Sequence, residues 1–152
     1  MRRMLAIVLG LFVAGCGGEG PTASGGLAGT FDLVTIDGVP PPKLELINMA
    51  LDTLFVTGAE MRVLSRGRLS MVRRHRWHSS ASGPLPEDPD TAIVSYRLSG
   101  TALFLDYPVT VPYGPYTDTA EVVADDVITV RTKVYGLALG TVFVRNYRYQ
   151  RR

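Results

Sequence analysis

Two polar side chains on one face of a predicted strand are the first candidates for chemistry in this sequence. They belong to the segment Arg73-Arg74-His75-Arg76-Trp77-His78, which falls in a predicted strand over residues 68–77. Because side chains alternate along a strand, Arg73 and His75 share a face with Trp77. Binding sites for small molecules combine apolar walls with a few placed polar groups, and these two residues could orient a ligand carboxylate. We predict a ligand site at Arg73, His75, Trp77 and Tyr96, with an open rim in water as the alternative.

The predicted size of this site is small, because most side chains that alternate onto the inward face are large. An eight-stranded barrel has little room once such side chains fill it. We therefore expect at most a modest pocket near Trp77, wide enough for a small apolar tail. The core candidates are Phe31, Leu33, Leu69, Met71, Trp77, Val94, Tyr96, Leu98, Leu103, Leu105, Ile128, Val130, Phe143, Tyr147 and Tyr149.

The opposite face of the same predicted strand is basic. Alternation places Arg68, Arg74 and Arg76 on it. A guanidinium matches a phosphate or carboxylate with two parallel hydrogen bonds, so this face predicts a surface for lipid phosphates or an acidic partner. A solvated strand face in a neutral protein is the alternative interpretation.

The sequence does not favour a metal site or catalysis. His75 and His78 are the only histidines, and residues three apart on a strand point to opposite faces. Zinc sites need three or four converging ligands, and the one cysteine, Cys16, lies far away in the chain. There is no Gly-x-Ser-x-Gly motif and no phosphate-binding glycine loop. We predict no metal, no cofactor and no enzymatic activity.

The segment that ends at Cys16 indicates processing and modification of the chain, not ligand binding. Arg2 and Arg3 precede an almost unbroken apolar run from Met4 to Ala14, which is typical of a secretory signal. Val13-Ala14-Gly15-Cys16 resembles the lipobox of bacterial lipoproteins at every position. The resemblance implies that residues 1–15 are a signal peptide and that Cys16 carries lipid. It also implies a membrane anchor in the bacterial cell envelope, at the outer membrane where there are two, because Gly17 is not the aspartate that retains lipoproteins at the inner one.

The composition limits the possible partners. The whole chain has 16 basic and 14 acidic residues, and the two arginines of the signal account for the basic excess. A neutral mature protein is not expected to bind nucleic acid, since such proteins keep a basic surplus. The length fits one domain, which we expect to be monomeric.

Beyond Cys16 the sequence predicts a tether and then one antiparallel all-β domain. Residues 16–26 are glycine-rich and form the tether, and the domain covers residues 27–152. Turn residues separate predicted strands at 29–36, 51–57, 60–64, 68–77, 91–98, 101–107, 117–124, 127–134 and 141–149.

Three connecting segments carry further expectations. Residues 43–50 allow either a helical turn or strand, because Leu44, Ile47 and Leu51 fit one helical face. Residues 79–89 contain three prolines and are predicted as a polar loop. Residues 108–115 form a second proline-rich loop, with tyrosines that could meet a partner.

About eight strands with short connections predict an up-and-down barrel, which leaves no exposed strand edge, and a β-sandwich is the alternative. Four short motifs stand in order along the domain: Gly29-x-Phe31-x-Leu33, Asp37-Gly38-x-Pro40, Ser95-Tyr96-Arg97-Leu98-Ser99-Gly100 and Asn146-Tyr147-Arg148-Tyr149. In this order they resemble the small bacterial lipocalin-like lipoproteins. The resemblance implies a barrel that holds a small apolar molecule. The alternative function is an interaction module of the envelope with a filled core, which binds a partner through the arginines or the tyrosine loop.

Overall fold

The structure is a computed structural model that describes residues 27–48, 50–65, 67–108, 116–136 and 141–152. The predicted signal peptide, Cys16, the tether and most of the tyrosine loop lie outside these residues. The described part contains nine strands and no helix. The strands are β1 (Thr30–Ile36), β2 (Lys43–Ile47), β3 (Thr53–Ser65), β4 (Arg68–Ser79), β5 (Gly83–Ser99), β6 (Ala102–Tyr107), β7 (Tyr116–Ala124), β8 (Val127–Gly136) and β9 (Thr141–Arg151).

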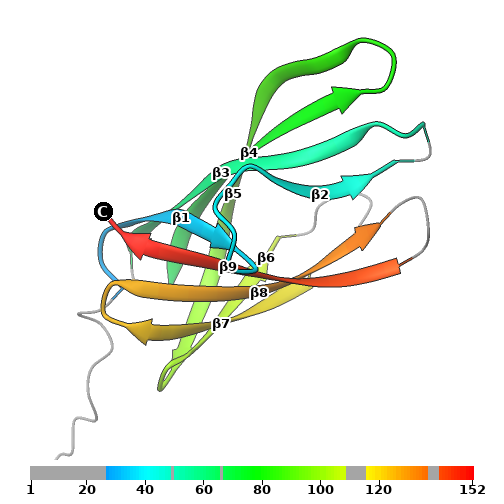
Figure 1. The fold of residues 1–152 in the computed structure, drawn as a ribbon. Helices are drawn as coiled ribbons and strands as arrows, with labels where there is room; N and C mark the ends of the chain where they lie inside the picture. The colour runs from blue at the N-terminus through cyan, green and yellow to red at the C-terminus, as the bar shows by residue number, and fades with distance from the viewer. Residues whose placement is uncertain (1–26, 49, 66, 109–115, 137–140) are drawn as a thin grey trace, which may run out of the picture.

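Eight of these strands close into an antiparallel barrel, which confirms the predicted fold class over a sandwich. From β3 to β9 each strand pairs with the next in the chain, and β1 pairs with both β9 and β3 (Figure 1). The predicted contact between first and last strands is present, with Phe31 opposite Arg151 and Leu33 opposite Tyr149. Closure therefore gives both edges of the sheet a partner along β1.

β2 is the ninth strand and lies outside the closed ring. Its only partner in the described sheet is β3, at residues Thr53–Val56, while β1 pairs with β3 further along, at Glu60–Arg62. The second half of β3 thus pairs with β1 within the barrel, and the first half of β3 pairs with β2. A register shift between Val56 and Gly58 separates the two halves, as expected of a bulge that bends a strand.

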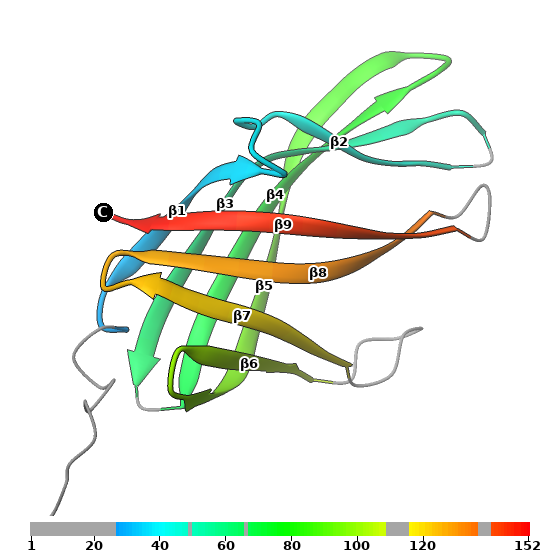
Figure 2. The same ribbon diagram turned by 60° about the horizontal axis from the view of Figure 1, so that its bottom comes forward.

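The two ends of the barrel differ. At one end Leu27 is buried, the C-terminal backbone bonds to β1 through Arg152 N and Thr30 O at 2.9 Å, and Asp126 O accepts from Arg151 N at 2.7 Å. At the other end the hairpins β2–β3, β4–β5 and β8–β9 extend past the ring (Figure 2). We call the first the filled end and the second the mouth.

Alternation fills the barrel between these ends. Fully buried side chains come from every strand of the ring except β7, which contributes the buried Ala120 and Asp118. Of the predicted core, eleven side chains are buried, namely Phe31, Leu33, Leu69, Met71, Val94, Leu103, Leu105, Ile128, Val130, Tyr147 and Tyr149. Tyr96 and Leu98 pack partly buried against them. Phe143 was expected in the core, and this prediction is wrong: it lies in the part of β9 beyond the ring and is 44% exposed.

Three predictions of local structure need correction. Residues 43–47 form a strand, so the helical turn is wrong; pairing to β3 outweighs the helical spacing of the leucines. The predicted strand at 51–57 is present from Thr53, but it does not end at Gly58, because the bulge carries β3 through to Ser65. Residues 83–89 belong to β5 and not to a loop. Their prolines are tolerated because β6 pairs with β5 only from Ser95 onward, so this stretch is an edge.

Candidate functional site

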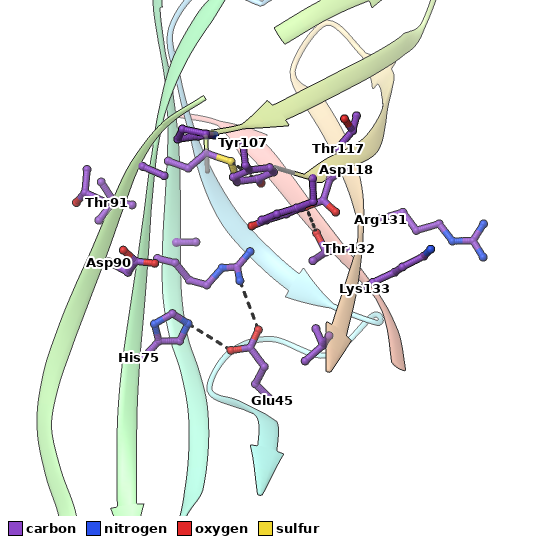
Figure 3. Close-up of a pocket in the computed structure, with 18 of the residues that line it drawn as sticks. Glu45, His75, Asp90, Thr91, Tyr107, Thr117, Asp118, Arg131, Thr132 and Lys133 are labelled. Carbon is purple, nitrogen blue, oxygen red and sulfur yellow. Dashed lines mark hydrogen bonds and ion pairs between the residues drawn. The ribbon is translucent and has the colours of Figure 1, made fainter. Parts of the chain in front are cut away.

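A cavity of about 1610 Å³ opens at the mouth of the barrel. Its walls include apolar side chains such as Leu54, Met71, Ala92 and Val134. Polar and charged side chains are at least as numerous, among them Glu45, His75 and Asp118 (Figure 3). Asp90 to Ile93 of β5 and Tyr116 to Thr119 of β7 also line the cavity. A concave space that combines apolar walls with converging polar groups is a candidate small-molecule site.

Three polar side chains surround the carboxylate of Glu45, which belongs to β2. The Tyr147 hydroxyl donates to Glu45 Oε1 at 2.8 Å, Arg73 Nη1 lies 3.5 Å from the same oxygen, and His75 Nε2 lies 3.3 Å from Oε2. The guanidinium of Arg73 also stands over the Tyr147 ring, 5.1 Å from its centre. Three residues of the barrel wall therefore hold one carboxylate that comes from outside the ring. Figure 3 shows the contact between His75 and Glu45.

A β-bulge explains how a strand outside the ring reaches this position. In the pairing of β2 with β3, Leu44 is opposite Phe55 and Leu46 is opposite Leu54, so Glu45 has no opposite residue. An extra residue in a bulge turns its side chain away from the regular alternation. Glu45 is 8% exposed while its neighbour Leu44 is 37% exposed. Glu45, the only acidic side chain of β2, thus lines the cavity at the point where the register of β2 and β3 shifts.

The electrostatics of this cluster favour an ion pair. Burial raises the pKa of Glu45, but the hydrogen bond from His75, the charge of Arg73 and the hydrogen bond from Tyr147 together outweigh it, so the net shift is downward. Burial raises the pKa of Tyr147 far above its usual value. Tyr147 therefore stays a neutral donor, while Glu45 is a carboxylate that faces a permanent cation.

A second polar pair lies across the cavity. Asp118 is 5% exposed and its Oδ2 accepts from the Thr132 hydroxyl at 2.8 Å. Burial raises the pKa of Asp118. Next to it the rings of Tyr107 and Tyr116 stack with centres 4.4 Å apart, and the Tyr107 hydroxyl lies 3.0 Å from the sulfur of Met71. This side of the cavity offers aromatic faces and one buried carboxyl group whose pKa is raised by burial.

A separate cluster on the surface holds the approach to β2. The carboxylate of Asp37 accepts from Lys43 Nζ at 2.9 Å, Arg145 Nη1 at 2.9 Å and the Asn146 backbone N at 2.8 Å. Arg145 Nη2 also donates to Leu44 O at 3.3 Å. Burial raises the pKa of Asp37, but these hydrogen bonds outweigh it and lower the pKa from 3.8 to about 2.

Replacing Asp37 with asparagine is expected to cost about 1 kcal/mol at pH 7, after allowance for solvent screening of this partly exposed group. Asparagine tolerates the positive φ of 49° at this position, so the effect is one of charge. Because the folded pKa is depressed, the stabilisation is complete above pH 4 and is lost as the pH falls toward 2. Urea unfolding at pH 7 and pH 3 measures this, with Asp125→Asn in an exposed turn as control. An equal loss for Asp37→Asn at both pH values would contradict the electrostatic origin.

The structure separates the four residues predicted as a ligand site. Arg73 and His75 line the cavity, whereas Trp77 and Tyr96 are not part of its walls. Trp77 lies on the extension of β4 opposite Leu54, and Tyr96 lies toward the filled end, opposite Leu105. The open space therefore lies at Arg73 and not at Trp77, and it is larger than the expected modest pocket. Among the described residues, β6 pairs with β5 only from Ser95 onward, and Asp90 to Ile93 of β5 line the space.

The arginine face is exposed as alternation predicts. Arg68, Arg74 and Arg76 are all exposed, and Arg68 also lies at the outer border of the cavity. Glu87 stands directly opposite Arg76 on β5, and Thr57 donates a hydrogen bond to its carboxylate. An acidic neighbour reduces the positive potential of this face, which weakens the case for it as an anion-binding surface.

Two acidic residues that line the cavity, Glu45 and Asp118, were not predicted from the sequence. Glu45 stands in a segment of undecided structure, and a bulge leaves no periodic signal. Asp118 did have a signal, since it alternates with Ala120 and Val122 onto the inward face of β7. Among the described residues, no three histidine, cysteine or acidic side chains are placed to hold a metal ion. The same residues contain no helix that is long and apolar enough to cross a membrane.

No family model, curated protein or solved structure matches this chain.

Proposed function

We propose that this chain is a lipid-anchored protein of the bacterial cell envelope, whose lipocalin-like barrel binds a small, mostly apolar molecule in the cavity at its mouth. We propose no catalytic activity for it. The observation that carries the proposal is the cavity itself, which combines apolar walls with a polar cluster at Arg73 and His75. Sites of this composition orient an apolar ligand by a single polar group.

The anchor part of the proposal depends on the segment that ends at Cys16. Its charge, apolar run and Val13-Ala14-Gly15-Cys16 motif support cleavage before Cys16 and lipid attachment to its thiol. Gly17 supports the outer membrane in a bacterium that has two. We propose a monomer with no cofactor and no nucleic acid partner.

Mass spectrometry of the protein extracted from its own membranes tests both parts. Under denaturing conditions, the expected mass is that of the chain from Cys16 with acyl groups added. Under native conditions, an additional small apolar molecule is expected on the folded protein and should be released on unfolding. The Cys16→Ser variant should remain an unprocessed precursor and serves as control.

The two parts fail separately in this experiment. A mature wild-type chain that begins at Met1 would contradict the anchor. A native protein that carries no small molecule, and that no apolar compound stabilises against heat, would contradict ligand binding, because a ligand of the folded state must raise its stability.

The alternative, an interaction module with a filled core, is less well supported. The filled end is packed, whereas a cavity lies between the described residues of the mouth, and the exposed Arg76 has Glu87 of β5 opposite it.

A further inference from the structure

We propose that Glu45 occupies, from within the chain, the position at Arg73 that the carboxylate of an amphiphilic ligand takes on binding. Ligand and β2 then compete for one anion position, and β2 acts as a displaceable strap across the mouth. This proposal rests on the proposed function and assigns a ligand class to it: an apolar tail with a single carboxylate head.

The wall of the cavity is built to hold one carboxylate. Arg73 and His75 come from β4 and Tyr147 comes from β9, and all three belong to the closed ring. The carboxylate they hold comes from β2, which is not part of that ring. The donors are thus a fixed feature of the barrel, whereas the acceptor is borne by an accessory strand.

Arg73 is the least satisfied member of the cluster. A guanidinium has five N–H donors in a planar fork. Among the described residues it makes one hydrogen bond, to Glu45 Oε1 at 3.5 Å, which is at the outer limit for such a bond. Its side chain retains 24% exposure and lines the cavity. A carboxylate that arrives from the cavity can form the two parallel bonds that Glu45 does not form.

Exchange of carboxylates avoids an electrostatic penalty. Glu45 is the anion in direct contact with Arg73, and Asp90, opposite Arg73 on β5, and the buried Asp118 line the same cavity. A ligand carboxylate added to the pair of Arg73 and Glu45 would bring one more anion into these surroundings, whereas replacement of Glu45 leaves the charge at Arg73 unchanged. Uncompensated charge in a poorly hydrated interior is costly, so replacement is favoured over addition.

β2 can leave without opening the barrel. Its five residues pair with β3 alone among the described strands, and β1 closes the ring by pairing with β3 and β9. The start of β2 stays attached through Lys43 Nζ, which lies 3.0 Å from Ile36 O and 2.9 Å from Asp37 Oδ2. Release of Glu45 would remove the side-chain tie of β2 to the ring, and the segment from Glu45 to Ile47 would then be held only by its pairing with Thr53 and Leu54 of β3 and by its two ends.

The experiment compares two probes of equal tail length, decanoate and 1-decanol, on the wild type and on Glu45→Gln at pH 7.5. Glutamine keeps the shape of the side chain and its hydrogen bond from Tyr147 but gives up the charge. Isothermal titration is expected to show that Glu45→Gln binds decanoate about tenfold more tightly, the gain of one charge-assisted hydrogen bond. Its affinity for 1-decanol should change less than about twofold. Glu121→Gln, an exposed residue of β7, is the matched control and should change neither.

Hydrogen exchange on the wild type gives a second readout that needs no variant. Decanoate is expected to accelerate the exchange of amides in β2 while it slows exchange in β4 and β9. Slower exchange in β2 on binding, or an equal affinity change of Glu45→Gln for both probes, would overturn this proposal and leave the proposed function standing. If neither probe binds either protein, this proposal fails together with the proposed function for simple amphiphiles.

Discussion

Replacing Arg73 with methionine is expected to lower the free energy of unfolding by about 2–3 kcal/mol at pH 7. The variant keeps an unbranched apolar stem in place of the aliphatic part of arginine but leaves the Glu45 carboxylate, 8% exposed, without the Arg73 cation. Removal of one partner of a buried ion pair is costly mainly because of the charge that is left behind. Urea unfolding measures the loss. Arg74→Met, one residue further along and on the outward face, is the matched control and should cost less than about 0.5 kcal/mol.

The pH dependence of this variant tests the cause. Without Arg73, burial is no longer outweighed to the same extent, so the folded pKa of Glu45 rises. A group with a raised folded pKa is most favourable to folding below its unfolded pKa, so the deficit should be smallest near pH 4 and grow toward pH 7. The double variant Arg73→Met/Glu45→Gln is expected to recover most of the loss at pH 7. A deficit that is independent of pH and not relieved in the double variant would mean that Arg73 acts by packing alone.

Replacing Phe31 with alanine is expected to cost about 3–4 kcal/mol, the largest stability effect predicted for this protein. Phe31 is fully buried on β1, opposite Met61 of β3 and Arg151 of β9, so it packs where the ring closes. The guanidinium of Arg151 also stands over its ring, 5.3 Å from the centre. Loss of the phenyl side chain leaves a cavity beneath β1, the strand that pairs with both β3 and β9.

Phe143→Ala is the matched control for this prediction. Phe143 is 44% exposed beyond the ring, and its loss should cost less than about 1 kcal/mol. Chemical unfolding of both variants gives the comparison. Equal costs would mean that the closure of β1 against β3 and β9 does not determine the stability of the barrel.

The sequence predicted the ring because its signals are local and regular. Alternation over 68–77, 101–107 and 127–134 placed Leu69, Leu103 and Ile128 inside, and the turn at Ser99-Gly100 joined two strands as expected. Up-and-down topology then follows from short connections, since neighbouring strands in the chain become neighbours in the sheet. The strands of the filled end needed no information beyond this pattern.

The mouth was predicted less well because its structure depends on departures from the pattern. Register shifts next to Glu45, Thr57 and Trp77 change which face a side chain takes, and no spacing in the sequence announces them. Proline in 84–89 indicates a loop only if the strand needs a partner on both sides, and here one side is an edge. Arg73 and His75 were identified because alternation holds that far along β4, whereas Glu45, their partner, was not.

The place where the chain enters the barrel bears on how a ligand would be exchanged. Leu27, the first described residue, is packed into the filled end, and the mouth lies at the opposite end of the ring (Figure 2). If Cys16 anchors the chain as proposed above, the anchored segment joins the barrel at the filled end, and a molecule in the cavity would leave at the end away from that junction. Exchange would pass through water or through collision with a second acceptor at the mouth. Its rate would then follow the concentration of that acceptor and the solubility of the ligand, not the amount of the membrane that carries the protein.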